Sequence, residues 1–149
     1  MLIYKQAIYC LIKERNSYMK KKVLITGVTG TMGFATLKQF ADHTDRFDIR
    51  VLARKTSFNE KMLQPYEEKT EIVWGDLTDD DCLRECVRDM DYVLAIGAFV
   101  SPMADAHPEE CIRTNYGSTL SMLREIKQLG QADKTHFVFI GSVSMYGDR

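Results

Sequence analysis

The sequence has no apolar run long enough to cross a bilayer, and its net charge is only −1. A membrane-spanning helix needs about 20 consecutive apolar residues, so we expect no membrane partner. Because basic and acidic residues nearly balance, no overall field attracts polyanions, and we expect no nucleic-acid partner. The first 22 residues have a short apolar centre and no small-residue cleavage site, so they are not typical of a signal peptide. These absences predict a cytoplasmic protein.

Metal-ligand patterns are also missing. The four cysteines, Cys10, Cys82, Cys86 and Cys111, do not have the spacing of a metal site, and we interpret them as reduced thiols. The acidic run Asp79–Asp81 precedes an apolar segment, where carboxylates cap a helix and favour its dipole. We therefore predict no metal site.

Strand-like and helix-like segments alternate through the rest of the chain. We expect strands at 23–26, 49–53, 71–74, 92–96 and 136–140, and helices at 31–43, 79–87 and 108–129, with a short helix or loop at 57–63. This alternation predicts an α/β fold with a Rossmann-type doubly wound parallel sheet, truncated after the fifth strand. Residues 20–149 would form one incomplete NAD(P)-binding domain. Residues 1–19 would be an N-terminal extension, either an appended helix or a poorly ordered segment ahead of Met19 as the original initiator.

Glycines recur at every third position just after the first expected strand, at Gly27, Gly30 and Gly33. A strand-to-helix turn at the carboxyl edge of a parallel sheet presents unpaired backbone amides. Glycine there allows close approach of a diphosphate and close packing of helix against strand. The pattern favours a phosphate-binding loop over an ordinary tight turn.

This loop and four further motifs, from about Lys21 to Arg149, resemble the extended short-chain dehydrogenase/reductase family, the NAD-dependent epimerase/dehydratase group. In order along the chain they are Thr26-Gly27-x-x-Gly30-x-x-Gly33, Gly75-Asp76-Leu77, Leu94–Ala98, Thr114–Thr119 and Gly141–Gly147. The resemblance implies a nicotinamide dinucleotide held by Gly27, Thr29, Gly30, Thr31, Met32, Gly33, Asp76, Leu77, Ala95, Ile96, Gly97, Ala98 and Asn115.

The end of the second expected strand carries Arg54 and Lys55. A carboxylate at this point would favour NAD, whereas cations pair with the 2′-phosphate of NADP. We therefore predict that Arg54 and Lys55 bind the cofactor and that it is NADP, with NAD as the alternative. A solvated basic turn is the other interpretation.

The resemblance also implies a catalytic serine, tyrosine and lysine, of which Ser142 matches the serine, with Ser144 as a neighbouring candidate. Tyr146 lies too close to the serine motif to be the catalytic tyrosine, and no Tyr-x-x-x-Lys follows Ser142. We therefore expect this chain to bind cofactor without turnover. The predicted whole enzyme transfers hydride between NADP(H) and a carbonyl or alcohol of a small molecule. A nucleotide-sugar epimerase or dehydratase and a non-catalytic NADP-sensing module are the alternatives.

The long segment 108–129 has apolar residues at largely helical spacing, at Ile112, Leu120, Leu123, Ile126 and Leu129. This stripe predicts a helix face packed against the sheet. The resemblance implies that the same helix contributes to a homodimer in a full-length protein.

Overall fold

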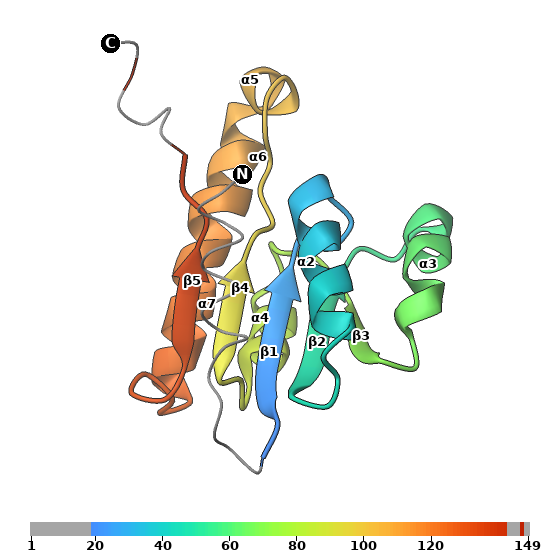
Figure 1. Cartoon of the computed structure of the whole chain (residues 1–149). Helices are drawn as coiled ribbons and strands as arrows, with labels where there is room; N and C mark the ends of the chain where they lie inside the picture. The colour runs from blue at the N-terminus through green and yellow to red at the C-terminus, as the bar shows by residue number, and fades with distance from the viewer. Residues whose placement is uncertain (1–18, 143–146, 148–149) are drawn as a thin grey trace.

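The computed structural model describes residues 19–142 and 147. Within them the chain forms an all-parallel sheet of five strands in the order β3-β2-β1-β4-β5 (Figure 1). The strands are β1 (Lys21–Thr26), β2 (Phe47–Ala53), β3 (Thr70–Trp74), β4 (Tyr92–Ala95) and β5 (His136–Phe139). The expected α/β, Rossmann-type fold is confirmed. The expected N-terminal extension lies outside the described residues except for Met19.

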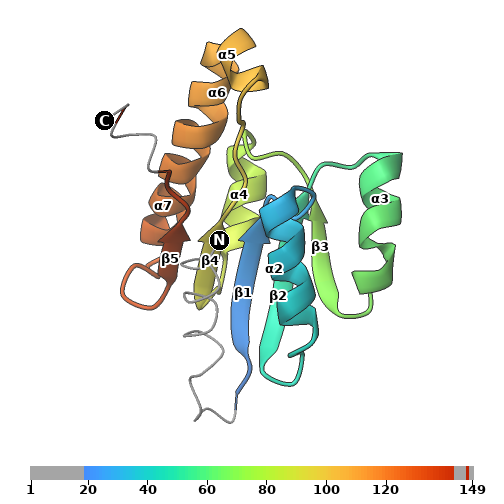
Figure 2. The same ribbon diagram turned by 45° about the horizontal axis from the view of Figure 1, so that its top comes forward.

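Helices cover both faces of the sheet, as Figures 1 and 2 show. On one face lie α2 (Thr31–Ala41) and α3 (Ser57–Leu63), the latter followed by a 3₁₀ turn at Gln64–Tyr66. On the other face lie α4 (Asp80–Val87) and α7 (Ser118–Gln128). None of the described helices combines the length and apolar character needed to cross a bilayer.

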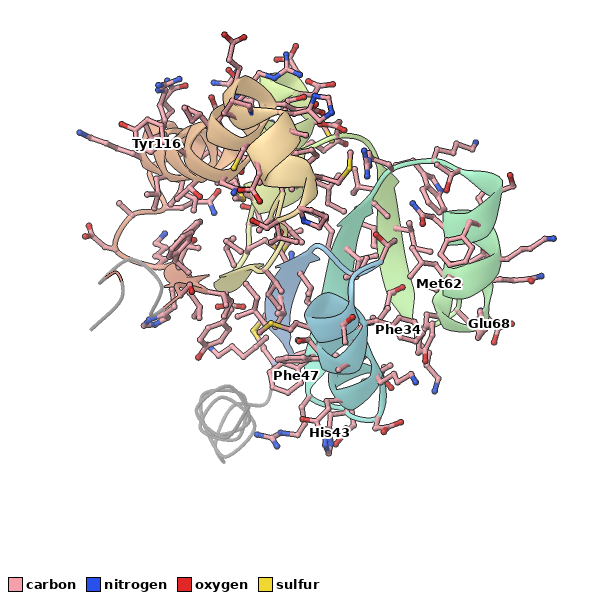
Figure 3. All side chains as sticks on the ribbon, turned by 90° about the horizontal axis from the view of Figure 1, so that it is seen from above. Phe34, His43, Phe47, Met62, Glu68 and Tyr116 are labelled. Atoms are coloured by element: carbon pink, nitrogen blue, oxygen red, sulfur yellow. The ribbon has the colours of Figure 1, made fainter. Side chains whose placement is uncertain are left out.

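The core has two layers because successive strand residues point to opposite faces. Val23 and Ile25 of β1 join the layer that contains Phe40 of α2, whereas Leu24 joins the layer that contains Leu83 of α4. A central parallel strand is therefore apolar on both faces, as β1 is from Val23 to Ile25. On the α2 side, Phe34 packs edge-on against Tyr66, with ring centroids 5.8 Å apart; Figure 3 shows Phe34 on the side of α2 that faces α3.

Helix α4 begins as the acidic run predicts. One carboxylate oxygen of Asp79 accepts hydrogen bonds from the amides of Asp81 and Cys82, at 3.1 and 3.2 Å. The cap satisfies two of the unpaired donors at the helix start. Among the described residues, no group of three or more His, Cys, Asp and Glu side chains could hold a metal ion.

The helix expected at 108–129 is present but not uniform. A short helix, α5 (Met103–Ala106), precedes α6 (Pro108–Ile112), and a π-helical segment, η2 (Arg113–Gly117), separates α6 from α7. The hydroxyls of Ser118 and Thr119 donate to the carbonyl oxygens of Thr114 and Asn115, at 2.5 and 2.8 Å. Such hydrogen bonds compete with the regular helical pattern and bend helices.

The prediction that the apolar residues of this helix all pack against the sheet is wrong for three of the five. Ile112, Leu120 and Leu123 are 63%, 39% and 41% exposed, whereas Met122 and Ile126 are buried. The π-helical segment takes up an extra residue and so changes the phase of α6 and Ile112 relative to α7. Within α7 the buried face follows the spacing of Ser118, Met122, Glu125 and Ile126, and Leu120 and Leu123 lie off that face. The buried face of α7 also includes polar residues that pair with α4: Ser121 donates to Asp80, and Glu125 lies 2.7 Å from Arg84.

Candidate functional site

A cavity of about 500 Å³ lies at the carboxyl edge of the sheet. Its walls come from the segments that follow β1, β2, β3 and β4 and from the start of the long helical run. The chain crosses from one side of the sheet to the other between β1 and β4, and ligands of open α/β sheets bind at this kind of switch point. The position of the cavity therefore follows from strand order.

The three glycines after β1 meet different surroundings. Gly27 has φ +69°, and a Cβ on it would lie 2.5 Å from the Cα of Gly97. A Cβ on Gly33 would lie 2.0 Å from the carbonyl oxygen of Gly27. Gly30 has an ordinary φ of −93°, and its nearest contact would be an unstrained 3.4 Å. The fold itself thus requires glycine at 27 and 33 but not at 30.

The turn after β4 is fixed to the end of β1 by one hydroxyl. Thr26 is buried and accepts hydrogen bonds from the amides of Ile96 and Gly97, at 3.1 and 3.0 Å. The hydroxyl lies 3.5 Å from the carbonyl oxygen of Leu94, to which it donates. This network holds the backbone of β4 against the glycine loop and shapes one wall of the cavity.

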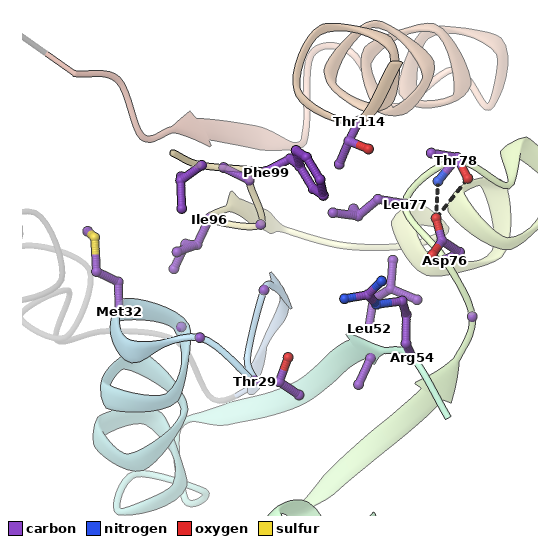
Figure 4. A pocket seen from close by; sticks show the side chains of 18 of the residues that line it. Thr29, Met32, Leu52, Arg54, Asp76, Leu77, Thr78, Ile96, Phe99 and Thr114 are labelled. Atoms are coloured by element: carbon purple, nitrogen blue, oxygen red, sulfur yellow. Dashed lines mark hydrogen bonds between the residues drawn. The ribbon is translucent and has the colours of Figure 1, made fainter. Parts of the chain in front are cut away.

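Asp76 follows β3 and stays ionised at neutral pH. Burial, the largest single effect, raises the pKa of its carboxyl group, but hydrogen bonds from Thr78 and the charges of Arg54 and Arg113 together outweigh it. Both the amide and the hydroxyl of Thr78 donate to Asp76 Oδ1, at 2.9 and 2.7 Å (Figure 4). The net result is a pKa below the ordinary value of 3.8.

Arg54 lines the cavity where β2 ends. Its backbone is held by α3: the side-chain amide of Asn59, which is 9% exposed, donates to the Arg54 carbonyl oxygen at 2.7 Å. The backbone amide of Asn59 donates to the hydroxyl of Thr56, the N-cap of α3. Figure 4 shows the Arg54 side chain lying beside Leu52 and reaching into the cavity.

Asn115 fixes the chain that leaves β4. Its side-chain oxygen accepts from the amide of Phe99 at 2.7 Å, and its side-chain nitrogen donates to the carbonyl oxygen of Phe99 at 2.9 Å. This two-point contact ties the π-helical segment to the apolar rim of the cavity. Asn115 is therefore placed to hold backbone, and it is not part of the cavity lining.

Most of the residues expected to bind a cofactor come together in this one cavity. Those that line it are Gly27, Thr29, Gly30, Thr31, Met32, Gly33, Arg54, Asp76, Leu77, Ile96, Gly97 and Ala98.

The lining does not include Lys55, Ala95, Asn115 or Ser142. The Nζ of Lys55 lies 3.9 Å from Oε1 of Glu60 on α3. Ala95 is the buried last residue of β4. Ser142 is exposed, three residues beyond the end of β5. Ser144 and Tyr146 lie outside the described residues.

The structure adds residues that sequence reasoning missed. Glu110, Arg113 and Thr114 reach the cavity from α6 and η2. Arg113 directly precedes the motif Thr114–Thr119, so its position in the sequence could have suggested a role at the same site. Which side of the helix faces the cavity could not be read from the sequence, because the π-helical segment alters the helical phase.

Comparisons with known proteins agree with this geometry. A family model described as the NAD dependent epimerase/dehydratase family matches residues 23–149. The chain is 30% identical over 112 residues to a UDP-glucose 4-epimerase of Rickettsia bellii, covering 72% of this chain and 33% of that protein. It is 30% identical over 100 residues to a UDP-N-acetylglucosamine 4,6-dehydratase (inverting) of Campylobacter jejuni, covering 66% and 30%. The chain thus spans about a third of the length of these curated relatives.

Solved structures share the fold. A UDP-glucose 4-epimerase from Bifidobacterium longum, in complex with NAD+ and UDP, superposes with a TM-score of 0.67 at 20% identity. The match covers 85% of this chain and 38% of that one. The PbgP3 protein from Burkholderia pseudomallei gives a TM-score of 0.69 at 24% identity, covering 87% and 41%.

Proposed function

Because the chain belongs to the NAD-dependent epimerase/dehydratase family, we propose that its cavity binds a nicotinamide dinucleotide with the diphosphate over the loop that follows β1. The observation that carries this proposal is the contrast among the three glycines. Gly27 and Gly33 are required by contacts inside the protein, whereas Gly30 has room for a Cβ. A ligand that closely approaches the backbone accounts for glycine at position 30, and helix α2 begins immediately after it.

The adenosine end of the cofactor would lie between Asp76 and Arg54. Asp76, ionised and held by Thr78, is suited to accept a hydrogen bond from the adenine amino group, and Leu77 adds an apolar surface. Arg54 is suited to pair with a 2′-phosphate, since guanidinium binds phosphate through two parallel hydrogen bonds. We therefore propose a preference for NADP, carried by Arg54; Lys55 contributes only a more distant charge because it lies beside Glu60.

The proposed reaction of the whole protein is hydride transfer between NADP(H) and a carbonyl or alcohol of a small-molecule substrate. The nicotinamide supplies the hydride when bound. In this chain, Thr26 and Asn115 hold the backbone after β4. The apolar Phe99 and Val100 line the cavity and would cover the nicotinamide end of a bound cofactor. Ser142, at the same carboxyl edge, would donate a hydrogen bond to the substrate oxygen.

A second candidate is a nucleotide-sugar epimerase or dehydratase, which is favoured by the names of the Rickettsia and Campylobacter relatives. It would use the same cavity and return the cofactor unchanged after each turnover. A reductase consumes NADPH in proportion to product, an epimerase or dehydratase forms product with no net loss of cofactor, and a sensing module binds cofactor without product. For the 149-residue chain itself, we propose binding without turnover, because no Tyr-x-x-x-Lys follows Ser142.

Calorimetric titration of the purified chain with NADPH and NADH tests the binding site. We expect Gly30→Val to abolish binding of both cofactors while the urea midpoint stays near that of the parent chain, because a side chain at 30 blocks the diphosphate. Gly141→Ala is the matched control, since Gly141 is exposed and outside the cavity lining. Unchanged binding in Gly30→Val, or no binding by a folded parent chain, would refute the proposal.

Cofactor choice has its own test. Arg54→Asp should weaken NADPH much more than NADH, because the new carboxylate repels the 2′-phosphate and accepts from a ribose hydroxyl. Lys55→Asp is the control and should have a smaller effect. Equal losses for NADPH and NADH in Arg54→Asp would overturn the assignment to NADP.

We also propose that the exposed apolar face of the helical run packs against a second copy of the chain. Ile112, Tyr116, Leu120 and Leu123 recur every three or four residues along α6 to α7, and each is at least 39% exposed. Tyr116 lies on the outer side of this run in Figure 3. Sedimentation velocity should give a dimer for the parent chain and a monomer for Leu123→Lys. A monomeric parent chain at high concentration would contradict this proposal.

A further inference from the structure

We propose that Arg113 is a second determinant of cofactor choice, which holds the 2′-phosphate together with Arg54 from the opposite wall of the cavity. This inference rests on the proposed NADP site and deepens it. The sequence placed the 2′-phosphate only beside residues at the end of β2, whereas Arg113 belongs to a helical segment some 60 residues further along the chain.

The placement of the two arginines is the first argument. Both line the cavity, Arg54 at the end of β2 and Arg113 in the π-helical segment η2. Figure 4 shows Arg54 and Thr114, the neighbour of Arg113, on opposite sides of the cavity with Leu77 and Asp76 between them. The cavity lining thus includes one arginine from the end of β2 and one from η2.

The charges around Asp76 are the second argument. Both arginines act electrostatically on the Asp76 carboxylate, so both positive charges lie near the same end of the cavity. Glu110, an exposed carboxylate three residues before Arg113, is the other acidic residue of the lining. The two arginines balance the charges of these two carboxylates, so the lining has no excess negative charge that would repel an anion.

The lack of partners is the third argument. Among residues 19–142, the guanidinium groups of Arg54 and Arg113 make neither a hydrogen bond nor an ion pair within 4 Å. By contrast, Arg50 and Arg84 are bound to carboxylates and carbonyl oxygens. A phosphate monoester, with a charge of about −1.5 to −2 at pH 7, would accept hydrogen bonds from both guanidinium groups.

Adenosine 2′,5′-bisphosphate and adenosine 5′-monophosphate are the probes, because they differ only in the 2′-phosphate and avoid the nicotinamide end. We expect Arg113→Gln in the full 149-residue chain to raise the Kd of the bisphosphate by roughly 10- to 100-fold, the range for a charge-assisted hydrogen bond. The Kd of the monophosphate should stay within about twofold. Arg124→Gln is the matched control, since Arg124 is an exposed cation of α7 outside the cavity lining.

The outcomes separate this inference from the proposed function. If Arg113→Gln weakens both probes equally, or neither, Arg113 does not read the 2′-phosphate, although the dinucleotide site stands. If the parent chain binds neither probe and neither cofactor, the proposed function fails as well. A double variant with Arg54→Gln should lose less than the sum of the single effects if both arginines hold the same phosphate, and strict additivity would count against a shared site.

Discussion

The amide of Gly97 donates a hydrogen bond of 3.0 Å to the hydroxyl of Thr26. This contact joins the end of β1 to the turn after β4, 71 residues later, at the point where the cavity opens. Gly27 and Gly97 lie in close backbone contact beside this hydroxyl, which a Cβ on Gly97 would approach to 3.3 Å.

Replacing Thr26 with valine keeps the shape of the side chain and removes the acceptor. We expect a loss of about 1–3 kcal/mol in the free energy of unfolding, since the Gly97 amide is left without its partner. Thr26→Ser keeps the hydroxyl and should lose less. Urea denaturation of the three proteins measures the difference. A loss of stability in the serine variant with none in the valine variant would show that the methyl group matters and the hydroxyl does not.

Gly33 and Gly30 should respond differently to alanine. A Cβ at Gly33 would lie 2.0 Å from the carbonyl oxygen of Gly27, so Gly33→Ala should lower stability by about 1–3 kcal/mol through overpacking. Gly30→Ala meets nothing closer than 3.4 Å and should leave the urea midpoint nearly unchanged. Similar midpoints for the two variants would contradict the assignment of Gly33 to packing.

The Asp76 carboxylate should make stability depend on pH. Its pKa is lower in the folded chain than the ordinary 3.8, so ionised Asp76 stabilises the fold above that pH. This contribution is lost as the pH falls from about 4 through the lower pKa of the folded state. Asp76→Asn keeps the acceptor for Thr78 but not the charge.

Measuring unfolding free energies of the parent chain and Asp76→Asn at several pH values checks this sign. The parent chain should be the more stable at neutral pH, and the gap should close in acid. A gap that is constant with pH, or that widens as the pH falls, would contradict the lowered pKa.

Arg50 stabilises the fold away from the cavity. Its Nη1 donates to the carbonyl oxygens of Glu85, Cys86 and Arg88, at 2.9, 3.1 and 3.1 Å, where helix α4 ends. Cations at a helix C-terminus are favourable, and each hydrogen bond from a charged donor contributes about 1.5–3 kcal/mol.

We therefore expect Arg50→Met to destabilise the chain by about 2–3 kcal/mol and to leave cofactor affinity unchanged in the protein that remains folded. Glu71→Gln removes only the ion pair with Arg50, at 2.8 Å, whose carboxylate is 57% exposed. That control should cost about 0–1 kcal/mol. If the two variants lose equal stability, the ion pair and not the helix cap explains the role of Arg50.

Local patterns were sufficient for much of this molecule. Apolar runs predicted the strands, Asp79 predicted the start of α4, and the spacing of Gly27, Gly30 and Gly33 predicted the loop at the sheet edge. These features depend on interactions between near neighbours in the chain, such as a side chain capping its own helix. The order of parallel strands then brings the segments that follow them to one edge.

The long helical run shows where such patterns fail. Ile112, Leu120 and Leu123 read as a core stripe but are exposed, and the buried face instead pairs Glu125 with Arg84 and Ser121 with Asp80. Those partners lie on α4, so their role depends on a contact between helices distant in sequence.

The sequence by itself determined the class of fold, the glycine loop and the family, because each depends on residue types that recur at short, fixed spacings. Only the tertiary structure decided which cations face the cavity. It placed Lys55 beside Glu60, outside the cavity lining, and placed Arg113 in the same lining as Arg54. The physical reason is that side-chain direction, both at a strand end and in a helical run interrupted by a π-helical segment, is set by packing between segments far apart in the chain.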